Sequence, residues 1–441
     1  MTSRVERRAA RSSLFYASWN QRLRGQASTY WRPMAGTGKS TAMAGLRAVW
    51  EAEHGPGSVL GLAPSAAAAE VLADELGIDT ENIAKWLHEH HRTTQSLGYI
   101  DQLRQRLERA ATAGRNTIDL ELQLQLLYEE VRRWQPQPGQ LVIVDEASLA
   151  GTFALDELVE AAEHAGAKVL LAGDWGQLTG IEAGGMFRTL VADRDGLAPA
   201  LTDVRRFHNE WEKTASVELR VGDESAVETY VSQHRVVGGS RAEMLDALYR
   251  EWKADTEEGT TSLMIAPDSA TVVELNTRAR TDRIGAGHVS ADGLEVAGGQ
   301  SAGVGDLVIT RQNNRLLATG RRWVKNGDCW IVTATKADGS MIVQRHGGTG
   351  QDVLPADYVR ANVELGYATT SHRAQGRTVA TAHAMVSPTT TREALYVAVT
   401  RRYALWRAGR EASPTPLLDV PVAKFFYGGQ ECGCGVREVV E

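Results

Sequence analysis

The chain has 441 residues, of which 43% are hydrophobic and 23% charged, with a net charge of −7 and a pI near 5.9. That length is too great for one compact core and predicts two or three domains. The acidic balance argues against a protein that coats nucleic acid by bulk charge, and no apolar run approaches the roughly 20 residues of a membrane helix.

The first 33 residues differ in composition from the rest. Residues 1–33 hold seven arginines and one acid, Glu6, and they lack the apolar core of a secretory signal. The three cysteines, Cys329, Cys432 and Cys434, are too few for a disulfide framework. Both observations predict a cytoplasmic protein with an atypical leader.

From residue 34 the sequence alternates between helical and strand patterns. Predicted strands cover 58–63, 141–144 and 168–172, and predicted helices cover 41–54, 65–75, 99–134 and 153–164. Ser65 is a suitable N-cap for the second helix, and Pro136, Pro138 and Gly139 end the long helical stretch. The alternation predicts a parallel α/β sheet covered on both faces.

A second α/β pattern follows residue 201. Its predicted elements are helices at 244–253 and 270–280 and a strand at 262–266. Residues 300–364 instead alternate Val, Ile, Thr and Trp between the turn pairs Gly305-Asp306, Asn326-Gly327 and Asp338-Gly339. These hairpin signals predict a small antiparallel β-barrel inserted in the second half.

The first helix opens with the pattern of a phosphate-binding P-loop, Ala35-Gly36-Thr37-Gly38-Lys39-Ser40-Thr41. Glycines let backbone N–H groups approach phosphates, Lys39 would contact the β- and γ-phosphates, and Ser40 would bind Mg²⁺. A chance glycine-rich turn is the alternative. Pro33 stands where the full pattern has glycine, and residues 28–32 make a poor buried strand, so the usual supporting strand is not predicted.

Polar residues follow the next two predicted strands. Asp145 would hold Mg²⁺ and Glu146 would polarise the attacking water, although two acids at a strand end can also be solvated caps. Gln177, after the strand at 168–172, is placed to sense the γ-phosphate.

In this order the motifs resemble a superfamily 1 helicase of the RecD-like branch, and most closely the helicase region of the TrwC/TraI-type conjugative relaxases. The resemblance covers residues 34–401 and continues in 62–68 (Leu-Ala-Pro-Ser-Ala-Ala-Ala), 202–207 (Thr-Asp-Val-Arg-Arg-Phe), 367–378 (Tyr-Ala-Thr-Thr-Ser-His-Arg-Ala-Gln-Gly-Arg-Thr) and 395–401 (Leu-Tyr-Val-Ala-Val-Thr-Arg). The family's inserted barrel matches residues 300–364.

The resemblance implies an α/β fold with two RecA-like motor domains. The first would cover 34–201 with a helical insertion at about 97–136, and the second would cover 202–299 and 365–401 around the barrel. Residues 1–33 and 402–441 would be an atypical leader and tail.

The resemblance also implies ATP and Mg²⁺ as cofactors and translocation on single-stranded DNA, 5′ to 3′, with duplex unwinding. Conjugation or relaxosome proteins would be further partners. Residues with implied roles are Arg206 and the arginine finger Arg401 at the phosphates, and Pro64, Ser65, Thr369, Thr370, Ser371 and His372 on the strand.

Other candidates have plainer alternatives. Trp86, Trp175 and Trp323 could stack on bases, but packing is the favoured interpretation of each. The tract His88-Glu89-His90-His91 lacks the zinc-helix spacing because Arg92 stands four residues after His88. Cys432 and Cys434 have no second ligand pair nearby and are interpreted as free thiols.

Two rival functions remain open at this point. The chain lacks the histidine cluster of a relaxase nicking domain, and its ends look like foreign sequence from a truncated or frame-shifted gene. It could therefore be an inactive helicase remnant that binds nucleotide or DNA without turnover. A P-loop ATPase switch of another class is the second rival, against which the segments around Gln375 and Arg401 argue.

Overall fold

The structure is a computed structural model that describes residues 28–31, 37–180, 184–193, 204, 207, 209–319, 322–348, 350–375, 377, 379–387 and 389–400. The chain divides into two compact units, Met1–Arg205 and Arg206–Glu441. Each unit contains a parallel sheet with helices packed on it, which confirms the predicted α/β class.

The first unit is built on a five-stranded parallel sheet in the order β1-β5-β4-β2-β3. Its strands are β1 (Ser28–Trp31), β2 (Val59–Ala63), β3 (Asp79–Asn82), β4 (Leu141–Val144) and β5 (Lys168–Ala172). The central strand β4 is buried throughout, as the run Leu-Val-Ile-Val requires of a strand covered on both faces. The predicted strands are confirmed, and the polar edge strand β3 was not predicted.

Residues 28–31 form a regular strand, and the expectation of no supporting strand before the P-loop was wrong. β1 pairs in parallel with β5, with Ser28 opposite Val169 and Trp31 opposite Ala172. Because β1 lies at the sheet edge, it needs one hydrogen-bonded neighbour and not the apolar run of a central strand.

Helices cover both faces of this sheet. They are α2 (Lys39–His54), α3 (Ala66–Leu76), α6 (Thr152–Ala165) and α7 (Met186–Asp193), with a short 3-10 turn at Ala147–Leu149. Ser65 caps α3 as predicted, because its hydroxyl accepts a hydrogen bond from the Ala68 amide at 3.1 Å. Alternate residues of β4 enter different cores: Ile143 packs with α2 and α3, and Val142 packs with α6 and α7.

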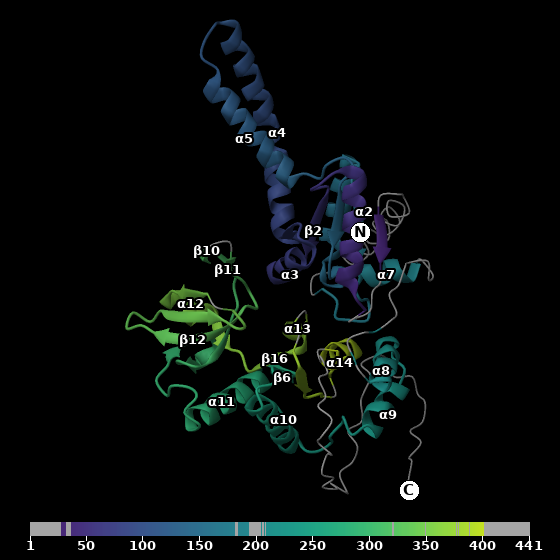
Figure 1. Ribbon diagram of the computed structural model, residues 1–441, viewed down its shortest axis with the longest axis vertical. Helices are drawn as coiled ribbons and strands as arrows, with labels where there is room; N and C mark the ends of the chain where they lie inside the picture. Colours follow the sequence, from purple (N-terminus) through teal and green to yellow (C-terminus); the bar gives the residue numbers. More distant parts are fainter. Residues whose placement is uncertain are drawn as a thin grey trace, which may run out of the picture. The chain divides into compact units, whose positions relative to one another are not determined.

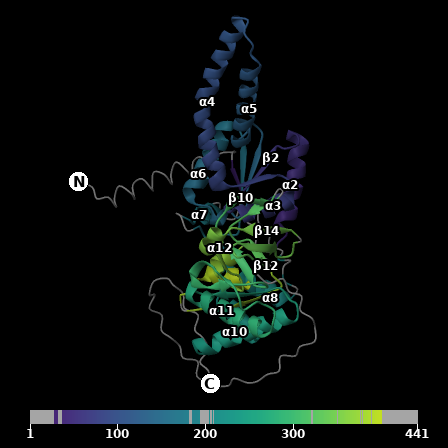
Figure 2. The ribbon, with the colours of Figure 1, turned by 90° about the vertical axis from the view of Figure 1, so that its left-hand side faces the viewer.

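The predicted helical stretch 99–134 is helical except at its middle, where a turn divides it between two antiparallel helices. They are α4 (Ile83–Thr112) and α5 (Ile118–Trp134), and the chain reverses between them near Gly114, which has φ 64°. Figures 1 and 2 show them side by side, running away from the sheet. Ile100 and Leu103 of α4 are buried, and Leu120, Leu124 and Leu127 of α5 are half-buried.

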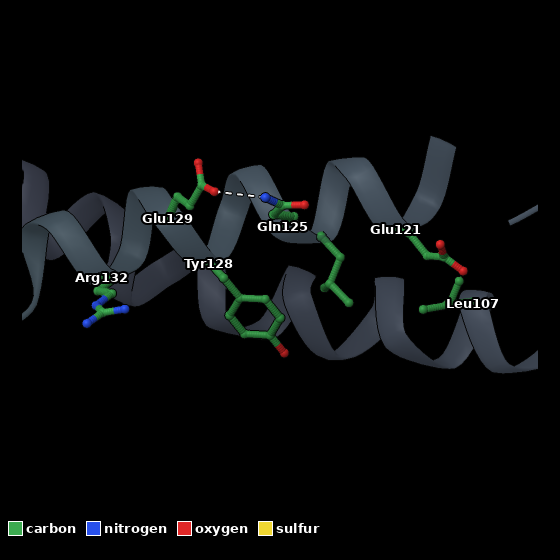
Figure 3. A pocket seen from close by; sticks show the side chains of 7 residues that line it. Leu107, Glu121, Gln125, Tyr128, Glu129 and Arg132 are labelled. Atoms are coloured by element: carbon green, nitrogen blue, oxygen red, sulfur yellow. Dashed lines mark hydrogen bonds between the residues drawn. The ribbon is translucent and has the colours of Figure 1, made fainter. Parts of the chain in front are cut away.

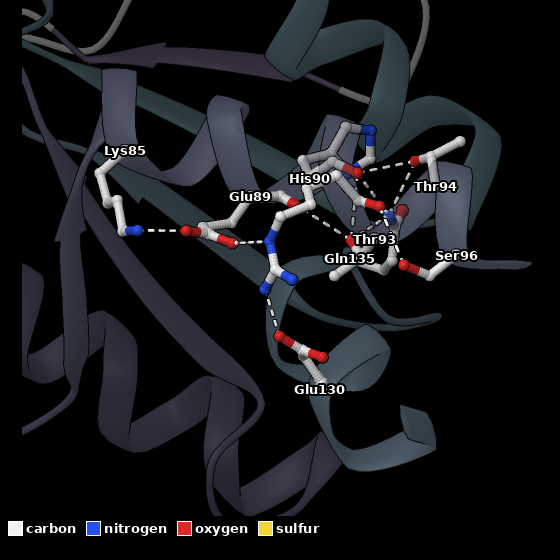
Figure 4. A network of polar contacts seen from close by, with 9 residues as sticks. Lys85, Glu89, His90, Thr93, Thr94, Ser96, Glu130 and Gln135 are labelled. Carbon is white, nitrogen blue, oxygen red and sulfur yellow. Dashed lines mark hydrogen bonds and ion pairs between the residues drawn. The ribbon is translucent and has the colours of Figure 1, made fainter. Parts of the chain in front are cut away.

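A polar network joins α4 and α5 at the base of this hairpin (Figure 4). Glu89, which is 7% exposed, accepts hydrogen bonds from Lys85 and from Arg92, and Arg92 also pairs with Glu130 of α5. The side-chain hydrogen bonds from Lys85 and Arg92 lower the pKa of Glu89 to about 2. Gln135, after α5, donates to the His90 carbonyl at 3.1 Å, which fixes α5 against α4.

The histidine tract belongs to the same base. The His90 ring stacks on Trp86 at 5.0 Å, and its Nδ1 lies 3.1 Å from the Trp134 carbonyl. The His91 ring pairs with Glu157 of α6. These contacts explain His90 and His91 by packing.

The second unit contains a three-stranded parallel sheet in the order β16-β6-β17. The strands are β6 (Ser262–Ala266), β16 (Ala368–Thr370) and β17 (Thr381–Ala384), and the helices around them are α8 (Glu210–Val221), α9 (Ser225–Ser232), α10 (Arg241–Glu257), α11 (Ser269–Gly285), α13 (Ser371–Ala374) and α14 (Arg392–Val399). The predicted strand 262–266 and helices 244–253 and 270–280 are confirmed. A capping box between Ser240 and Glu243 starts α10 three residues earlier than predicted.

Antiparallel strands occupy much of the predicted barrel region. The largest sheet has the order β14-β13-β12-β9-β15, and its strands are β9 (Leu307–Thr310), β12 (Cys329–Thr335), β13 (Met341–Arg345), β14 (Gln351–Leu354) and β15 (Val363–Leu365). Separate two-stranded pairs are β7 (Leu294–Glu295) with β8 (Ser301–Ala302), and β10 (Asn314–Thr319) with β11 (Arg322–Val324). A 3-10 turn (Ala297–Gly299) and α12 (Ala356–Asn362) complete the region. The barrel itself stays a prediction.

Only one of the three turn pairs makes a hairpin. Asp338-Gly339 joins the paired strands β12 and β13, whereas Gly305-Asp306 and Asn326-Gly327 connect strands of different sheets. Asp306 shows the reason, because its buried carboxylate accepts from the Gly303 amide at 2.7 Å and from the distant Tyr367 hydroxyl at 2.7 Å. Tertiary contacts therefore determine that turn.

Candidate functional site

The start of α2 and the carboxyl end of β4 bring three predicted residues together. Gly38 caps α2 in the left-handed region at φ 81°, which costs glycine little. The first helical residue, Lys39, has its Nζ atom 2.5 Å from Oδ1 of Asp145 and 3.1 Å from Oε1 of Glu146. One ammonium and two carboxylates thus form a compact charged cluster.

Burial and ion pairing shift the pKa values of these side chains in opposite directions. Burial raises the pKa of Asp145, and the nearby charge of Lys39 only partly offsets the effect. Burial disfavours the charged form of Lys39, but the carboxylates of Asp145 and Glu146 outweigh it and raise the pKa of the ammonium. Lys39 is therefore fully charged at neutral pH.

Glu146 has an unusual backbone. Its φ of 49° lies in the left-handed region, which non-glycine residues adopt at a cost on the order of 1–3 kcal/mol. Its amide donates to Oδ1 of Asp145 at 2.8 Å, which links the two acids. This strained turn directs the Glu146 carboxylate toward Lys39.

The end of β5 packs closely on the same turn. A Cβ atom on Gly173 would lie 3.1 Å from the amides of Ala147 and Ser148, so glycine permits this approach. The Gly173 amide donates to the Trp31 carbonyl at 3.3 Å, which aligns the ends of β1 and β5.

Gln177 follows in a buried turn. Its backbone amide donates to the Asp174 carbonyl at 3.1 Å, and the residue is 4% exposed. Its Oε1 atom accepts no hydrogen bond from any described residue. A buried amide oxygen of this kind is costly unless another group pairs with it.

Several predicted site residues contact groups outside the Lys39–Asp145–Glu146 cluster or lie outside the described residues. The Ser40 hydroxyl donates to Glu75 of α3 at 2.5 Å, and Thr37 is buried. Thr41 is exposed on α2, and Pro64 is half-buried between β2 and the capping residue Ser65. The residues outside the described ranges are Pro33, Ala35, Gly36, Arg206, Arg401, Cys432 and Cys434.

The predicted strand-contact segment borders a pocket in the second unit. Thr370, Ser371 and His372 line a cavity of about 160 Å³ at the carboxyl ends of β6, β16 and β17. Thr369 is 1% exposed, so its hydroxyl faces the interior of the unit and is poorly placed to touch a strand.

The pocket also contains hydroxyls that the sequence analysis missed. They come from Ser387, Thr389, Thr390 and Thr391, just before α14, and the run of hydroxyl residues there was the available signal. Among the described residues, no Asp or Glu lines the pocket. Hydroxyls and a histidine without a competing carboxylate suit the oxygens of a phosphate.

The tryptophans divide by burial. Trp86 is 1% exposed in the first core, so it cannot stack on a base. Trp175 packs against the same core and is half-buried. Trp323 is half-buried on β11.

The larger groove of about 370 Å³ lies on the α4–α5 hairpin (Figure 3). Leu107, Leu124 and Tyr128 are among its lining residues, and Gln125 donates to Glu129 at 3.0 Å along its side. It contains none of the predicted site residues. In the described part of the chain, no helix has the length and hydropathy to cross a membrane.

Comparison with known proteins agrees with these motifs. The family model described as "AAA domain" matches residues 21–241, which is half of the chain. The conjugal transfer protein TraA of Rhizobium radiobacter is 30% identical over 373 residues, which are 83% of this chain and 29% of that protein. The ATP-dependent RecD2 DNA helicase of Deinococcus radiodurans is 27% identical over 315 residues, 65% of this chain and 40% of that protein.

A Pif1 helicase from Bacteroides, in complex with ADP-AlF3 and ssDNA, has a TM-score of 0.47 at 17% identity, with 87% of this chain and 88% of that chain covered. The chain spans less than a third of the length of the TraA proteins. The predicted relationship to RecD-like superfamily 1 helicases of the conjugation type is confirmed, and the chain belongs to the AAA domain family.

Proposed function

We propose that this chain hydrolyses ATP with Mg²⁺ and uses the energy to move along single-stranded DNA and unwind duplexes, 5′ to 3′, in conjugative DNA transfer. The observation that carries the proposal is the cluster of Lys39, Asp145 and Glu146 beside the left-handed Gly38. The TraA relatives support the setting in conjugation.

The donor set fits magnesium and a nucleotide. Described residues include no group of three or more His, Cys, Asp or Glu that could hold a metal by themselves. Mg²⁺ at nucleotide sites usually takes only one or two protein ligands beside phosphate and water. Asp145 and the Ser40 hydroxyl are the ligands we assign, and the ion would supply charge neutralisation at the phosphates.

Each protein group has a distinct role in this proposal. Lys39 exchanges its carboxylate partners for the β- and γ-phosphates, because a charged ammonium is equally satisfied by phosphate oxygens. Glu146 polarises the attacking water, and the backbone turn at φ 49° holds its carboxylate at the cluster. Gln177 senses the γ-phosphate side of the site through the attacking water, because its amide oxygen, which has no described partner, would accept a hydrogen bond from that water.

DNA contact is assigned to hydroxyls and to a histidine. Thr370, Ser371 and His372 line the second unit's pocket, whose described lining includes no carboxylate to repel a phosphate. Pro64 and Ser65 at the end of β2 are the corresponding segment in the first unit. Arg206 and Arg401 would complete the charge neutralisation at the nucleotide, as the family resemblance implies.

The two parallel-sheet units correspond to RecA-like motor domains in this proposal. Residues 97–136, which include α5 and the second half of α4, are the helical insertion of the first, and residues 300–364, which contain most of the antiparallel strands, are the barrel insertion of the second.

Measured hydrolysis with and without single-stranded DNA tests the proposal. We expect ATP hydrolysis that rises several-fold when DNA is added, and unwinding of a duplex with a 5′ tail. Binding without turnover would instead identify an inactive remnant, and turnover indifferent to DNA would identify another class of P-loop ATPase. Lys39→Ala serves as the background control in every assay.

A further inference from the structure

The outer face of α5 carries an apolar stripe that the described part of the chain leaves uncovered. Ile118, Leu122 and Leu126 follow one another at intervals of four residues, which places them on one face of the helix. Their exposed fractions are 67%, 54% and 56%. Single exposed apolar residues are ordinary on a protein surface, whereas an aligned row of them is typical of a contact surface.

The opposite face of α5 already has a partner. Leu120, Leu124 and Leu127 are half-buried, and α5 packs along α4. These three positions lie about half a turn around the helix from the stripe. The helix α4 therefore covers the inner face and leaves the stripe open, and none of the described residues buries any residue of α5.

The two ends of the stripe carry opposite charges. The exposed Glu129 follows Leu126 by three residues, and its carboxylate accepts a hydrogen bond from Gln125 at 3.0 Å (Figure 3). The exposed Arg115 lies in the connection just before α5. Neither Glu129 nor Arg115 makes an ion pair with a described residue. A second stripe that runs in the opposite direction would bring these charges together in pairs.

We propose that the stripe is an interface with a second copy of this chain, in which the α5 helices of the two copies pack antiparallel about a twofold axis at Leu122. In this register Leu122 meets the partner's Leu122, and Ile118 meets the partner's Leu126. Glu129 meets the partner's Arg115. Rows of residues spaced by four interdigitate in the commonest class of helix packing.

The same register brings no two charges of one sign together beside the stripe. Asp119 is opposite the partner's Gln125, and Glu121 is opposite the partner's Gln123. One surface thus supplies the apolar row and both charges in the order that twofold symmetry requires, which favours a second copy over an unrelated partner. The interface lies on the first unit and does not depend on the proposed motor activity.

The size of this surface sets the expected affinity. One pair of crossing helices buries less than the roughly 1,200 Å² at the lower limit of standard stable interfaces. We therefore expect a weak dimer, with a dissociation constant on the order of 10 µM.

The test is sedimentation velocity of the full chain at about 1 to 100 µM, a range that brackets this affinity. It needs neither ATP nor DNA. The variants are Leu122→Asp, Glu129→Arg and Arg115→Glu. The control is Val49→Asp, which introduces the same charge at an exposed apolar position of α2.

We expect the wild-type chain to change from monomer to dimer over this range. Leu122→Asp places two carboxylates at the axis and should raise the dissociation constant more than about tenfold. Its melting temperature should stay unchanged, because a side chain exposed this far contributes little to folding. Val49→Asp should dimerise as the wild-type chain does.

The charge variants test the antiparallel register. Glu129→Arg or Arg115→Glu alone should weaken the dimer about fivefold at low salt, since each changes both symmetry-related ion pairs. An equimolar mixture of these two single variants should associate as well as the wild-type chain, because every contact between positions 129 and 115 of unlike copies again joins opposite charges. Side chains that only support the fold of their own chain would show no such restoration.

Three results would overturn the proposal. The first is a wild-type chain that stays monomeric up to about 100 µM. The second is a dimer that Leu122→Asp leaves intact. The third is a mixture of the two charge variants that associates no better than either variant alone.

Discussion

Oδ1 of Asp145 lies 2.5 Å from Nζ of Lys39, although 106 positions separate the two residues in the chain. The contact joins the start of α2 to the end of β4 and places the cation of the P-loop beside the acids of the next motif. The charges of Lys39 and Asp145 stabilise each other, because an unpaired buried charge costs several kcal/mol. The ion pair therefore keeps the two side chains in place. It supplies an ammonium for the phosphates of the nucleotide and a carboxylate for the magnesium ion.

Lys39→Ala should abolish ATP hydrolysis, since it removes the charge that faces the β- and γ-phosphates. It also leaves Asp145 buried without its cation, so the pKa of that carboxyl should rise further. Steady-state hydrolysis measures the first effect and nucleotide affinity accompanies it. Normal turnover in this variant would remove the P-loop from the site.

Glu146→Gln should retain ATP binding and block cleavage, because an amide of the same size cannot polarise water as a carboxylate does. The backbone turn should survive, because the substitution keeps the side-chain length at position 146. It also keeps the hydrogen bond from the backbone amide of this left-handed residue to Oδ1 of Asp145. Nucleotide affinity measured beside single-turnover hydrolysis distinguishes the possibilities. Joint loss of binding and cleavage points to a structural role.

Much of the fold follows from local pattern. The runs at β2, β4, β5 and β6 are apolar because both faces of a parallel sheet are covered, and such strands are recognisable in any sequence. β1 could not be recognised, because an edge strand takes its order from the neighbour β5 and not from its own composition. The α4–α5 turn was not predicted, although Gly114 and Asn116, both turn-type residues, lie between the two helices.

The candidate site also contains residues that local sequence predicts and residues that only tertiary contacts bring together. Lys39, Asp145 and Glu146 were predicted because each follows a glycine-rich turn or a strand end, where geometry is local. Thr369 and Thr370 are adjacent in sequence, yet the side chain of one is buried and that of the other lines the pocket, because strand residues alternate between faces. The hydroxyls at Ser387–Thr391 join this pocket through tertiary contacts only.

Glu89→Gln should destabilise the hairpin base by about 1.5–3 kcal/mol at pH 7, the usual contribution of hydrogen bonds to a charged group. The pKa of Glu89 is lowered from its ordinary value near 4.5 to about 2, so its stabilisation is complete above pH 4.5 and is lost as the pH falls toward 2. Urea unfolding of wild type and Glu89→Gln at pH 7 and at pH 2 measures the difference. The assignment is contradicted if the difference in unfolding free energy between wild type and Glu89→Gln is as large at pH 2 as at pH 7.

DNA binding should weaken with salt along a shallow slope. Hydroxyls and one histidine line the strand-contact pocket, and each phosphate neutralised by a cation contributes about −0.7 to the log–log slope on single strands. Affinities measured across a salt series should therefore give a slope shallower than roughly −6. A steeper value would require an extended basic surface elsewhere in the chain.

Arg401→Ala tests whether the chain is a motor or a simple nucleotide switch. An arginine finger is worth on the order of 10³–10⁵ in rate in P-loop enzymes, or about 4–7 kcal/mol of transition-state stabilisation. The residue follows α14, whose end is closed by the buried Thr400 hydroxyl donating to the Tyr396 carbonyl at 2.6 Å.

The variant should bind ATP almost normally and lose DNA-stimulated hydrolysis, because the guanidinium acts only in the transition state. Arg392→Ala is the matched control, since it removes an arginine from the start of the same helix, where its partner is Glu393. Retained stimulation in Arg392→Ala and its loss in Arg401→Ala would assign the effect to the finger and not to the helix. Near-wild-type stimulated turnover in Arg401→Ala would take that arginine out of the reaction, and with it the main reason to prefer a helicase motor over a switch.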